Sequence, residues 1–162
     1  MIIRFILITF LTIFLELGFF AGFLDSFYVP ELSIPVIVCA SLLFSRKSGV
    51  ILAFILSIIL DITHVQSFGN RVLLFFIIAF LIGTYRENFP QKSFFVVIFL
   101  TFVSSIVYQL AFMLLSTIQG YVISIPILFK TIFSHEIIFN LIYSYLCFLL
   151  VPKNNKRGFY EF

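Results

Sequence analysis

Long apolar runs separated by only a few polar residues constrain this chain more than any other feature. The runs cover residues 2–24, 32–44, 49–64, 72–85, 93–118 and 131–151. A helix crosses the hydrocarbon core of a bilayer with about 20 apolar residues, so six such runs occupy most of the 162 residues. Charged residues make up only 10% of the sequence, whereas a soluble domain carries about 25%. We therefore predict an all-α fold, a polytopic membrane helix bundle with about six transmembrane helices in a single domain over residues 1–162.

The distribution of Lys and Arg predicts the orientation of this bundle. Six crossings with a cytoplasmic N-terminus place most of the basic residues inside, namely Arg4, Arg46, Lys47, Arg86, Lys92, Lys153, Lys156 and Arg157. Only Arg71 and Lys130 are then outside, as expected for membrane proteins, whose cytoplasmic loops are the basic ones. The run at 32–44 reaches only about 20 Å as a helix, against a core of about 30 Å. It is either a short span or a re-entrant segment, and five crossings remain an alternative.

Several function classes lack their sequence signatures. The net charge of +3 is scattered at the ends of apolar runs, which does not indicate nucleic-acid binding. Cys39 and Cys147 belong to no Cys/His cluster. His135 and Glu136 begin like the zinc motif H-E-x-x-H, but Phe139 stands where the second histidine belongs. We predict a protein without catalytic residues, metal or cofactor, and an intramembrane hydrolase ranks last among the hypotheses.

Polar residues inside three of the apolar runs share helix faces. The most polar of them are Glu16 in the first run, Gln109 in the fifth, and Glu136 and Asn140 in the sixth. Polar groups within a membrane usually face protein or a cavity. The first alternative is a set of buried interhelical hydrogen bonds, each contributing about 0.6–2 kcal/mol, and the second is a small-molecule cavity. We favour the hydrogen bonds.

The run at 49–64 carries small residues at every fourth position, Gly49, Ala53 and Ser57, followed by Asp61. Small residues at this spacing allow two helix backbones to approach closely, so we expect a helix-packing seam here. Asp61 lies near the C-terminal end of its helix, where the helix dipole disfavours an anion. Arg71, beyond a turn containing Gly69, is the expected counter-ion. We expect Asp61, Gly69 and Arg71 to clamp a helical hairpin. The alternative is a proton- or ligand-binding carboxylate.

The stretch from Tyr28 to Asn88 resembles the rod shape-determining MreD family. The resemblance rests on a proline and a glutamate (Val29-Pro30-Glu31-Leu32) that open a short apolar helix, followed by the basic turn Arg46-Lys47. It continues with Ile59-Leu60-Asp61-Ile62, the turn Phe68-Gly69-Asn70-Arg71 and an aromatic helix that ends near Tyr85. The other helices match the family only in hydropathy.

This resemblance implies a multi-pass protein of the bacterial cytoplasmic (inner) membrane, and the distribution of Lys and Arg predicts that both termini lie on the cytoplasmic side. It implies a non-enzymatic component of the cell-wall elongation (rod-shape) complex, which maintains cell shape by scaffolding partner membrane proteins. The implied partners are an MreC-like bitopic scaffold, a RodA-like glycosyltransferase, a class B penicillin-binding protein, the MreB filament and membrane lipid, but no nucleic acid. The six-helix body is also similar to substrate-binding subunits of energy-coupling-factor vitamin transporters. That resemblance provides the alternative function, with the polar stripes as a binding pocket.

Overall fold

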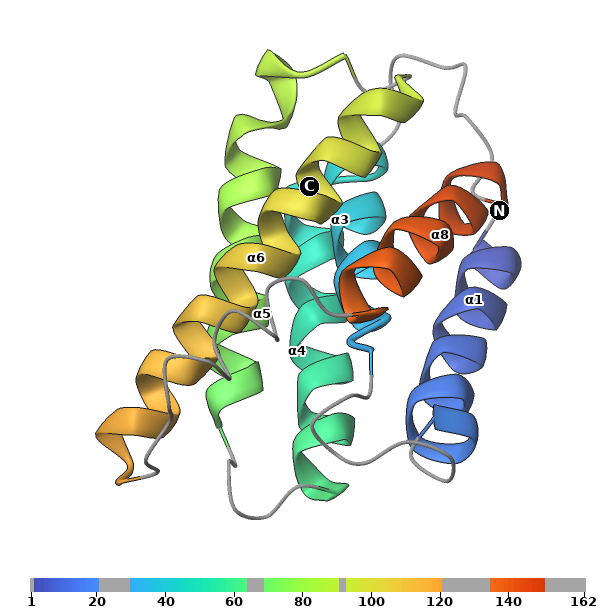
Figure 1. The fold of residues 1–162 in the computed structure, drawn as a ribbon. Helices are drawn as coiled ribbons and strands as arrows, with labels where there is room; N and C mark the ends of the chain where they lie inside the picture. Colours follow the sequence, from blue (N-terminus) through green and yellow to red (C-terminus); the bar gives the residue numbers. More distant parts are fainter. Residues whose placement is uncertain (1, 21–29, 64–68, 91–92, 121–134, 151–162) are drawn as a thin grey trace.

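The computed structural model describes residues 2–20, 30–63, 69–90, 93–120 and 135–150, and every regular element in these ranges is helical. The elements in chain order are α1 (Ile2–Phe14), the π-helical segment η1 (Leu15–Phe20), α3 (Ser33–Leu43), α4 (Arg46–Thr63), α5 (Asn70–Tyr85), the 3-10 turn η3 (Arg86–Asn88), α6 (Phe94–Ile118) and α8 (His135–Leu150). The all-α prediction is confirmed for these ranges. Figure 1 shows α5 and α6 on one side, α1 and α8 on the other, and α3 and α4 between them.

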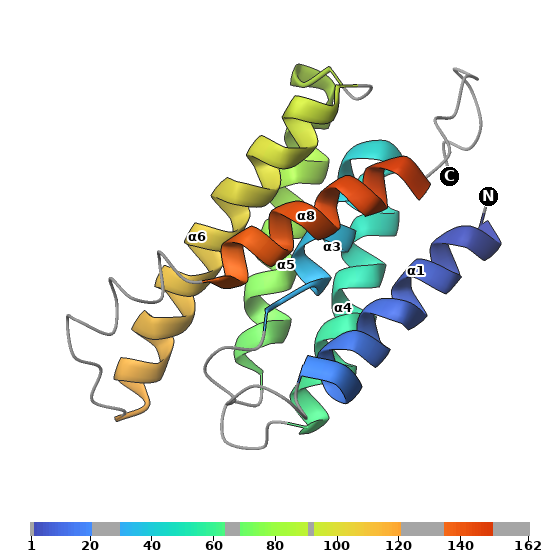
Figure 2. The same cartoon turned by 45° about the vertical axis from the view of Figure 1, so that its right-hand side comes forward.

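The centre of the fold is α3, the shortest of these α-helices. It contacts α1, α4, α5, α6 and α8, and α8 crosses in front of it in Figure 2. Every residue from Ser33 to Leu42 is buried. A helix that is apolar on all sides belongs in an interior, and α3 is enclosed by other helices of the same chain. Its 11 residues therefore do not have to match the bilayer thickness by themselves.

The surface of the bundle is apolar, whereas much of its polar content is inside. Phe95 and Ile118 on α6 are 80% and 82% exposed. By contrast, Glu16, Asp61 and Asn140 are buried. Large contiguous apolar surfaces are rare on soluble monomers and mark contact with protein or membrane.

Helix length distinguishes α6 from the other described helices. By length and composition alone, α6 is the one described helix that passes as a membrane span. Shorter apolar helical stretches lie at Ile6–Phe19, Ser33–Leu43 and Glu136–Leu150. The predicted number of crossings, the single domain and the orientation therefore stay predictions. Part of the charge pattern behind the orientation (Lys92, Lys130, Lys153, Lys156 and Arg157) lies outside the described residues.

Two helices differ in detail from the apolar runs that predicted them. The first apolar run changes from an α-helix to a π-helix at Leu15. The third predicted helix, α4, begins at Arg46, whereas the apolar run begins at Gly49, so the predicted basic turn is the first turn of α4. Ser45 explains the earlier start, because its Oγ accepts a hydrogen bond from the backbone N–H of Ser48 at 3.1 Å, and serine caps helix N-termini well. Hydropathy alone places a helix end at the first charged residue and misses such a cap.

Candidate functional site

A buried group of polar residues joins four helices at one end of the bundle. We call Glu31, Asp61, Gly69, Arg71 and Tyr108 the Arg71 cluster. Arg71, in the first turn of α5, donates to Glu31 Oε1 from Nη2 at 2.9 Å and from Nε at 3.1 Å. The Tyr108 hydroxyl, from α6, donates to the same oxygen at 3.0 Å. The cluster thus connects the start of α3 with the facing ends of α4 and α5 and with the middle of α6.

Asp61 takes a different place in the cluster from the one expected. Its Oδ2 accepts a hydrogen bond from the Gly69 backbone N–H at 2.8 Å, and Gly69 has a left-handed φ of 94°, which glycine adopts without steric cost. Its Oδ1 lies 3.9 Å from Arg71 Nη1 and is buried, with no hydrogen-bond partner among the described residues. Asp61, Gly69 and Arg71 do come together, but the nearest carboxylate to Arg71 is that of Glu31.

Sequence reasoning missed Glu31 as a partner of Arg71. The two residues are 40 positions apart, so neither helix spacing nor a hairpin turn connects them. The available signal was the glutamate immediately before a helix that is apolar throughout, since a charge at that point needs a partner once the helix is buried.

The electrostatics of the Arg71 cluster favour a structural role over a chemical one. One guanidinium faces two carboxylates, and the side chains of Arg71 and Glu31 are only 12% and 16% exposed. Buried charges remain ionised when they are paired and hydrogen-bonded. Removing one partner leaves an uncompensated charge in a medium of low polarity, whereas the intact cluster holds four helix segments in register.

A second contact strengthens the same end of the bundle. Asn70, next to Arg71, exchanges two side-chain hydrogen bonds with Gln119 at 3.1 and 3.2 Å. Gln119 lies directly after α6, so these bonds tie the start of α5 to the end of α6.

The predicted packing seam on α4 faces α3. A Cβ added at Gly49 would come within 2.8 Å of the Cα of Ser41 on α3, which is closer than real Cβ atoms approach. Ala53 and Ser57 are fully buried on the same face of α4. At the start of α4, a Cβ at Gly83 of α5 would lie 2.7 Å from the Cα of Arg46. Small residues therefore stand where α4 meets each of its two main neighbours.

Glu16 pairs with α3 rather than with the other polar stripes. Its Oε1 accepts from the Ser33 backbone N–H at 2.7 Å, and its Oε2 accepts from the Ser33 hydroxyl at 2.8 Å. Ser33 is the first residue of α3. A carboxylate at this position satisfies an otherwise unpaired N–H and interacts favourably with the helix dipole.

The remaining predicted polar residues join α6 to α8. Gln109 Nε2 donates to Glu136 Oε2 at 2.9 Å, and Asn140 Nδ2 donates to Ser105 Oγ at 3.2 Å. The amide oxygens of these two side chains, Gln109 Oε1 and Asn140 Oδ1, are buried and have no hydrogen-bond partner in the part of the chain that the structure describes. These residues make direct contacts between helices.

A further hydrogen bond joins α1 to α8, where the hydroxyls of Thr12 and Tyr143 lie 2.9 Å apart. Helix α8 thus links the polar residues of α1 with those of α6. In the described ranges no group of three or more His, Cys, Asp or Glu side chains is arranged to hold a metal ion.

Comparison with known proteins supports the resemblance noted in the sequence. The family model for rod shape-determining protein MreD matches residues 1–153, which includes every helix described above. No curated protein and no solved structure gives a significant match to the chain. The match extends well beyond the stretch from Tyr28 to Asn88 that carried the resemblance in the sequence. We conclude that the chain belongs to the MreD family and is a rod shape-determining membrane protein.

Proposed function

We propose that this protein is a non-enzymatic scaffold of the bacterial cell-wall elongation complex. It holds an MreC-like bitopic protein beside a RodA-like glycosyltransferase, a class B penicillin-binding protein and the MreB filament. In this proposal the chain crosses the cytoplasmic membrane six times and has both termini in the cytoplasm. The end of the bundle with Arg46 and Arg86 faces the cytoplasm, and the Arg71 cluster lies near the outer face.

The observation that carries this proposal is the separation of polar and apolar side chains. The polar groups of the Arg71 cluster, and those on α1, α6 and α8, make contacts between helices of the chain itself. The side chains left for a partner are large and apolar, for example Phe10, Phe95 and Ile142. A protein with this surface recognises partners by lateral helix packing within the bilayer.

The transporter alternative draws no support from the polar stripes. It requires polar side chains that face a ligand. Glu16 instead binds the first turn of α3, and Gln109 binds Glu136. We retain this alternative only as an outcome of the experiment.

Site-specific photocrosslinking in living cells tests the proposal. A crosslinking amino acid is placed at one exposed position on each of three helices, at Phe10 on α1, Phe95 on α6 and Ile142 on α8. Val36 is the matched control because it is fully buried in α3 and should capture no partner. We expect at least one exposed position to capture an MreC-like protein or a wall-synthesis enzyme.

Two results would contradict the proposal. One is the absence of any elongation protein from the crosslinks at all three exposed positions. The other is the capture of a transmembrane coupling subunit with paired ATPases, which would favour the transporter function.

A further inference from the structure

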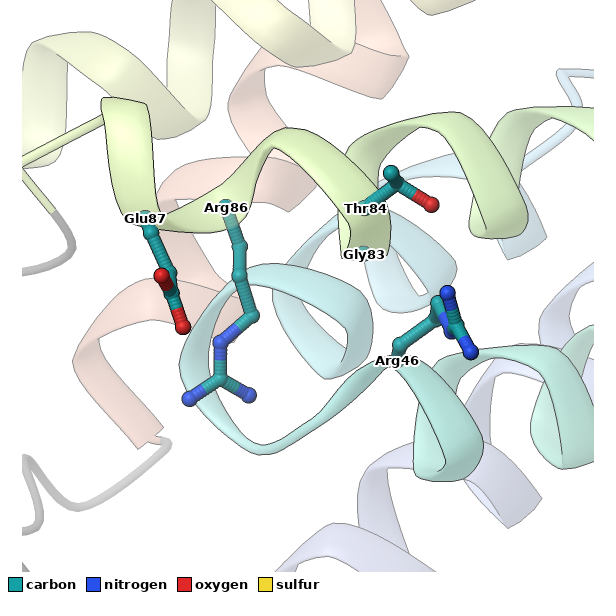
Figure 3. Close-up of a pocket in the computed structure, with 5 residues that line it drawn as sticks. All are labelled: Arg46, Gly83, Thr84, Arg86 and Glu87. Atoms are coloured by element: carbon teal, nitrogen blue, oxygen red, sulfur yellow. The ribbon is translucent and has the colours of Figure 1, made fainter.

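A cavity opens at the end of the bundle opposite the Arg71 cluster. It has a volume of about 340 Å³ and is lined by Arg46, Gly83, Thr84, Arg86 and Glu87. Figure 3 shows Arg46, from the first turn of α4, and Arg86, directly after α5, on either side of Gly83. Gly83 allows α5 to lie close to Arg46 of α4, and the side chains of both arginines line the same opening.

These arginines keep donors available for a ligand. Within the described part of the chain, neither arginine forms an ion pair. Arg46 stacks over the ring of Phe80, with 5.3 Å from its Cζ to the ring centroid. Arg86 donates from Nη1 to the carbonyl oxygen of Phe44 at 2.6 Å. Its Nε is buried and has no hydrogen-bond partner among the described residues, so the donors that can reach a ligand are those on its Nη atoms. Each guanidinium has five N–H donors, so both arginines have donors to spare.

The other polar residues that line the cavity limit which class of ligand it can bind. The hydroxyl of Thr84 already donates to the carbonyl of Phe80 at 2.8 Å, so the free donors are those of the arginines. Glu87 contributes one negative charge beside two positive ones, which leaves the lining with a single positive charge. That balance suits a singly charged phosphodiester. Arginine also recognises phosphate oxygens through its planar fork of donors.

An apolar strip leads away from the cavity along α5. Phe76, Phe80 and Thr84 follow at four-residue intervals and therefore share a helix face. The rings of Phe76 and Phe80 are stacked with centroids 6.1 Å apart, and both side chains are more than 40% exposed. A ligand with a charged head and apolar tails would place its head at the arginines and its tails along this strip.

We propose that this cavity binds the headgroup phosphate of an anionic phospholipid such as phosphatidylglycerol. Basic pockets between membrane helices on the cytoplasmic side are suited to acidic headgroups. The apolar strip favours a lipid over a free phosphate ion, because a free anion gains nothing from Phe76 and Phe80. This inference goes beyond scaffolding and does not depend on which protein partners bind, but it rests on the proposed orientation, in which this end of the bundle faces the cytoplasm.

Native mass spectrometry of the detergent-solubilised protein tests the site. The protein is titrated with phosphatidylglycerol and, separately, with phosphatidylcholine of the same acyl chains. Wild type is compared with Arg46→Gln and with Lys47→Gln, which removes the same charge from the same helix turn without lining the cavity. A hydrogen bond from the Arg46 guanidinium to the lipid phosphate contributes about 1 kcal/mol, which corresponds to about fivefold in affinity. We expect Arg46→Gln to weaken phosphatidylglycerol binding about fivefold and Lys47→Gln to leave it unchanged.

Two further variants keep the test decisive if Arg46→Gln does not fold. Glu87→Gln removes the acidic lining residue and should tighten phosphatidylglycerol binding. Arg86→Lys keeps the charge but loses the planar fork of donors, so it should weaken phosphatidylglycerol binding. Unchanged binding in both variants would overturn the proposal.

Three other results would also overturn it: equal binding of the two lipids, equal loss in Arg46→Gln and Lys47→Gln, or displacement of the lipid by millimolar inorganic phosphate. The last result would assign the cavity to a free anion.

Discussion

The ion pair between Arg71 and Glu31 should contribute more to stability than the pair between Arg71 and Asp61. At an effective dielectric constant of about 20, unit charges 2.9 Å apart attract by about 6 kcal/mol and charges 3.9 Å apart by about 4 kcal/mol, before the cost of removing them from water. Arg71 also donates two hydrogen bonds to Glu31, and no hydrogen bond joins it to Asp61 in the described structure. We expect the coupling free energy of the first pair to be about 2 kcal/mol larger.

Double-mutant cycles measure this difference. Glu31→Gln, Asp61→Asn and Arg71→Gln are combined in pairs, and the free energy of unfolding is measured in mild detergent. Arg71→Gln alone should destabilise the protein by about 3–5 kcal/mol, because it leaves two buried carboxylates without a counter-ion. Tyr108→Phe, which removes one hydrogen bond to Glu31, should cost about 1–2 kcal/mol and provides a milder control.

The opposite order of coupling energies would refute this reasoning. If Arg71 couples to Asp61 as strongly as to Glu31, then the hairpin clamp between α4 and α5 dominates, and the link to α3 is secondary. Coupling near zero for both pairs would mean that solvent reaches the cluster and screens its charges.

Three further substitutions test other contacts, each by the free energy of unfolding in detergent. Glu16→Ala should cost about 1–2 kcal/mol, because the first turn of α3 loses the carboxylate that accepts a hydrogen bond from the Ser33 backbone N–H. No loss of stability would mean that solvent replaces the carboxylate as the acceptor. Gly49→Ala should cost about 1–3 kcal/mol by overpacking against Ser41. Its control is Gly18→Ala, whose added Cβ would meet nothing closer than 3.7 Å and which should change the free energy of unfolding by less than about 0.5 kcal/mol. Equal effects of the two substitutions would exclude close packing at Gly49. Gly69→Ala should cost about 1–2 kcal/mol because Gly69 has a positive φ. Gly69→Asn should cost less, since asparagine tolerates this conformation. A larger loss of stability for asparagine than for alanine would contradict the backbone argument.

The helical class follows from the sequence, but the position of α3 does not. Its short length left open a short span or a re-entrant segment, and its uniform apolarity indicated a buried helix. Ser33, Val36 and Leu42 point in different directions around α3, and all are buried. Hydropathy records that a residue is apolar, but not whether lipid or another helix covers it.

Candidate site residues were predictable where partners are close in sequence. Asp61 and Arg71 are brought near each other by one turn, so spacing alone identified them. Glu31 and Glu16 were harder to place, because their partners are set by the packing of α3 among the other helices. Long-range pairs of this kind depend on tertiary arrangement, which helix periodicity does not encode.

The enclosure of α3 determines when it can reach its final environment during synthesis. Of the helices that surround it, only α1 precedes it in the chain, and α8 is made last. A nascent chain that ends before residue 135 leaves one face of α3, and the polar side chains aimed at α8, without their partner. The bundle therefore cannot mature strictly from its N-terminus to its C-terminus. The short helix α3 reaches its final environment only after α8 has been made, and until then one face of α3 stays exposed.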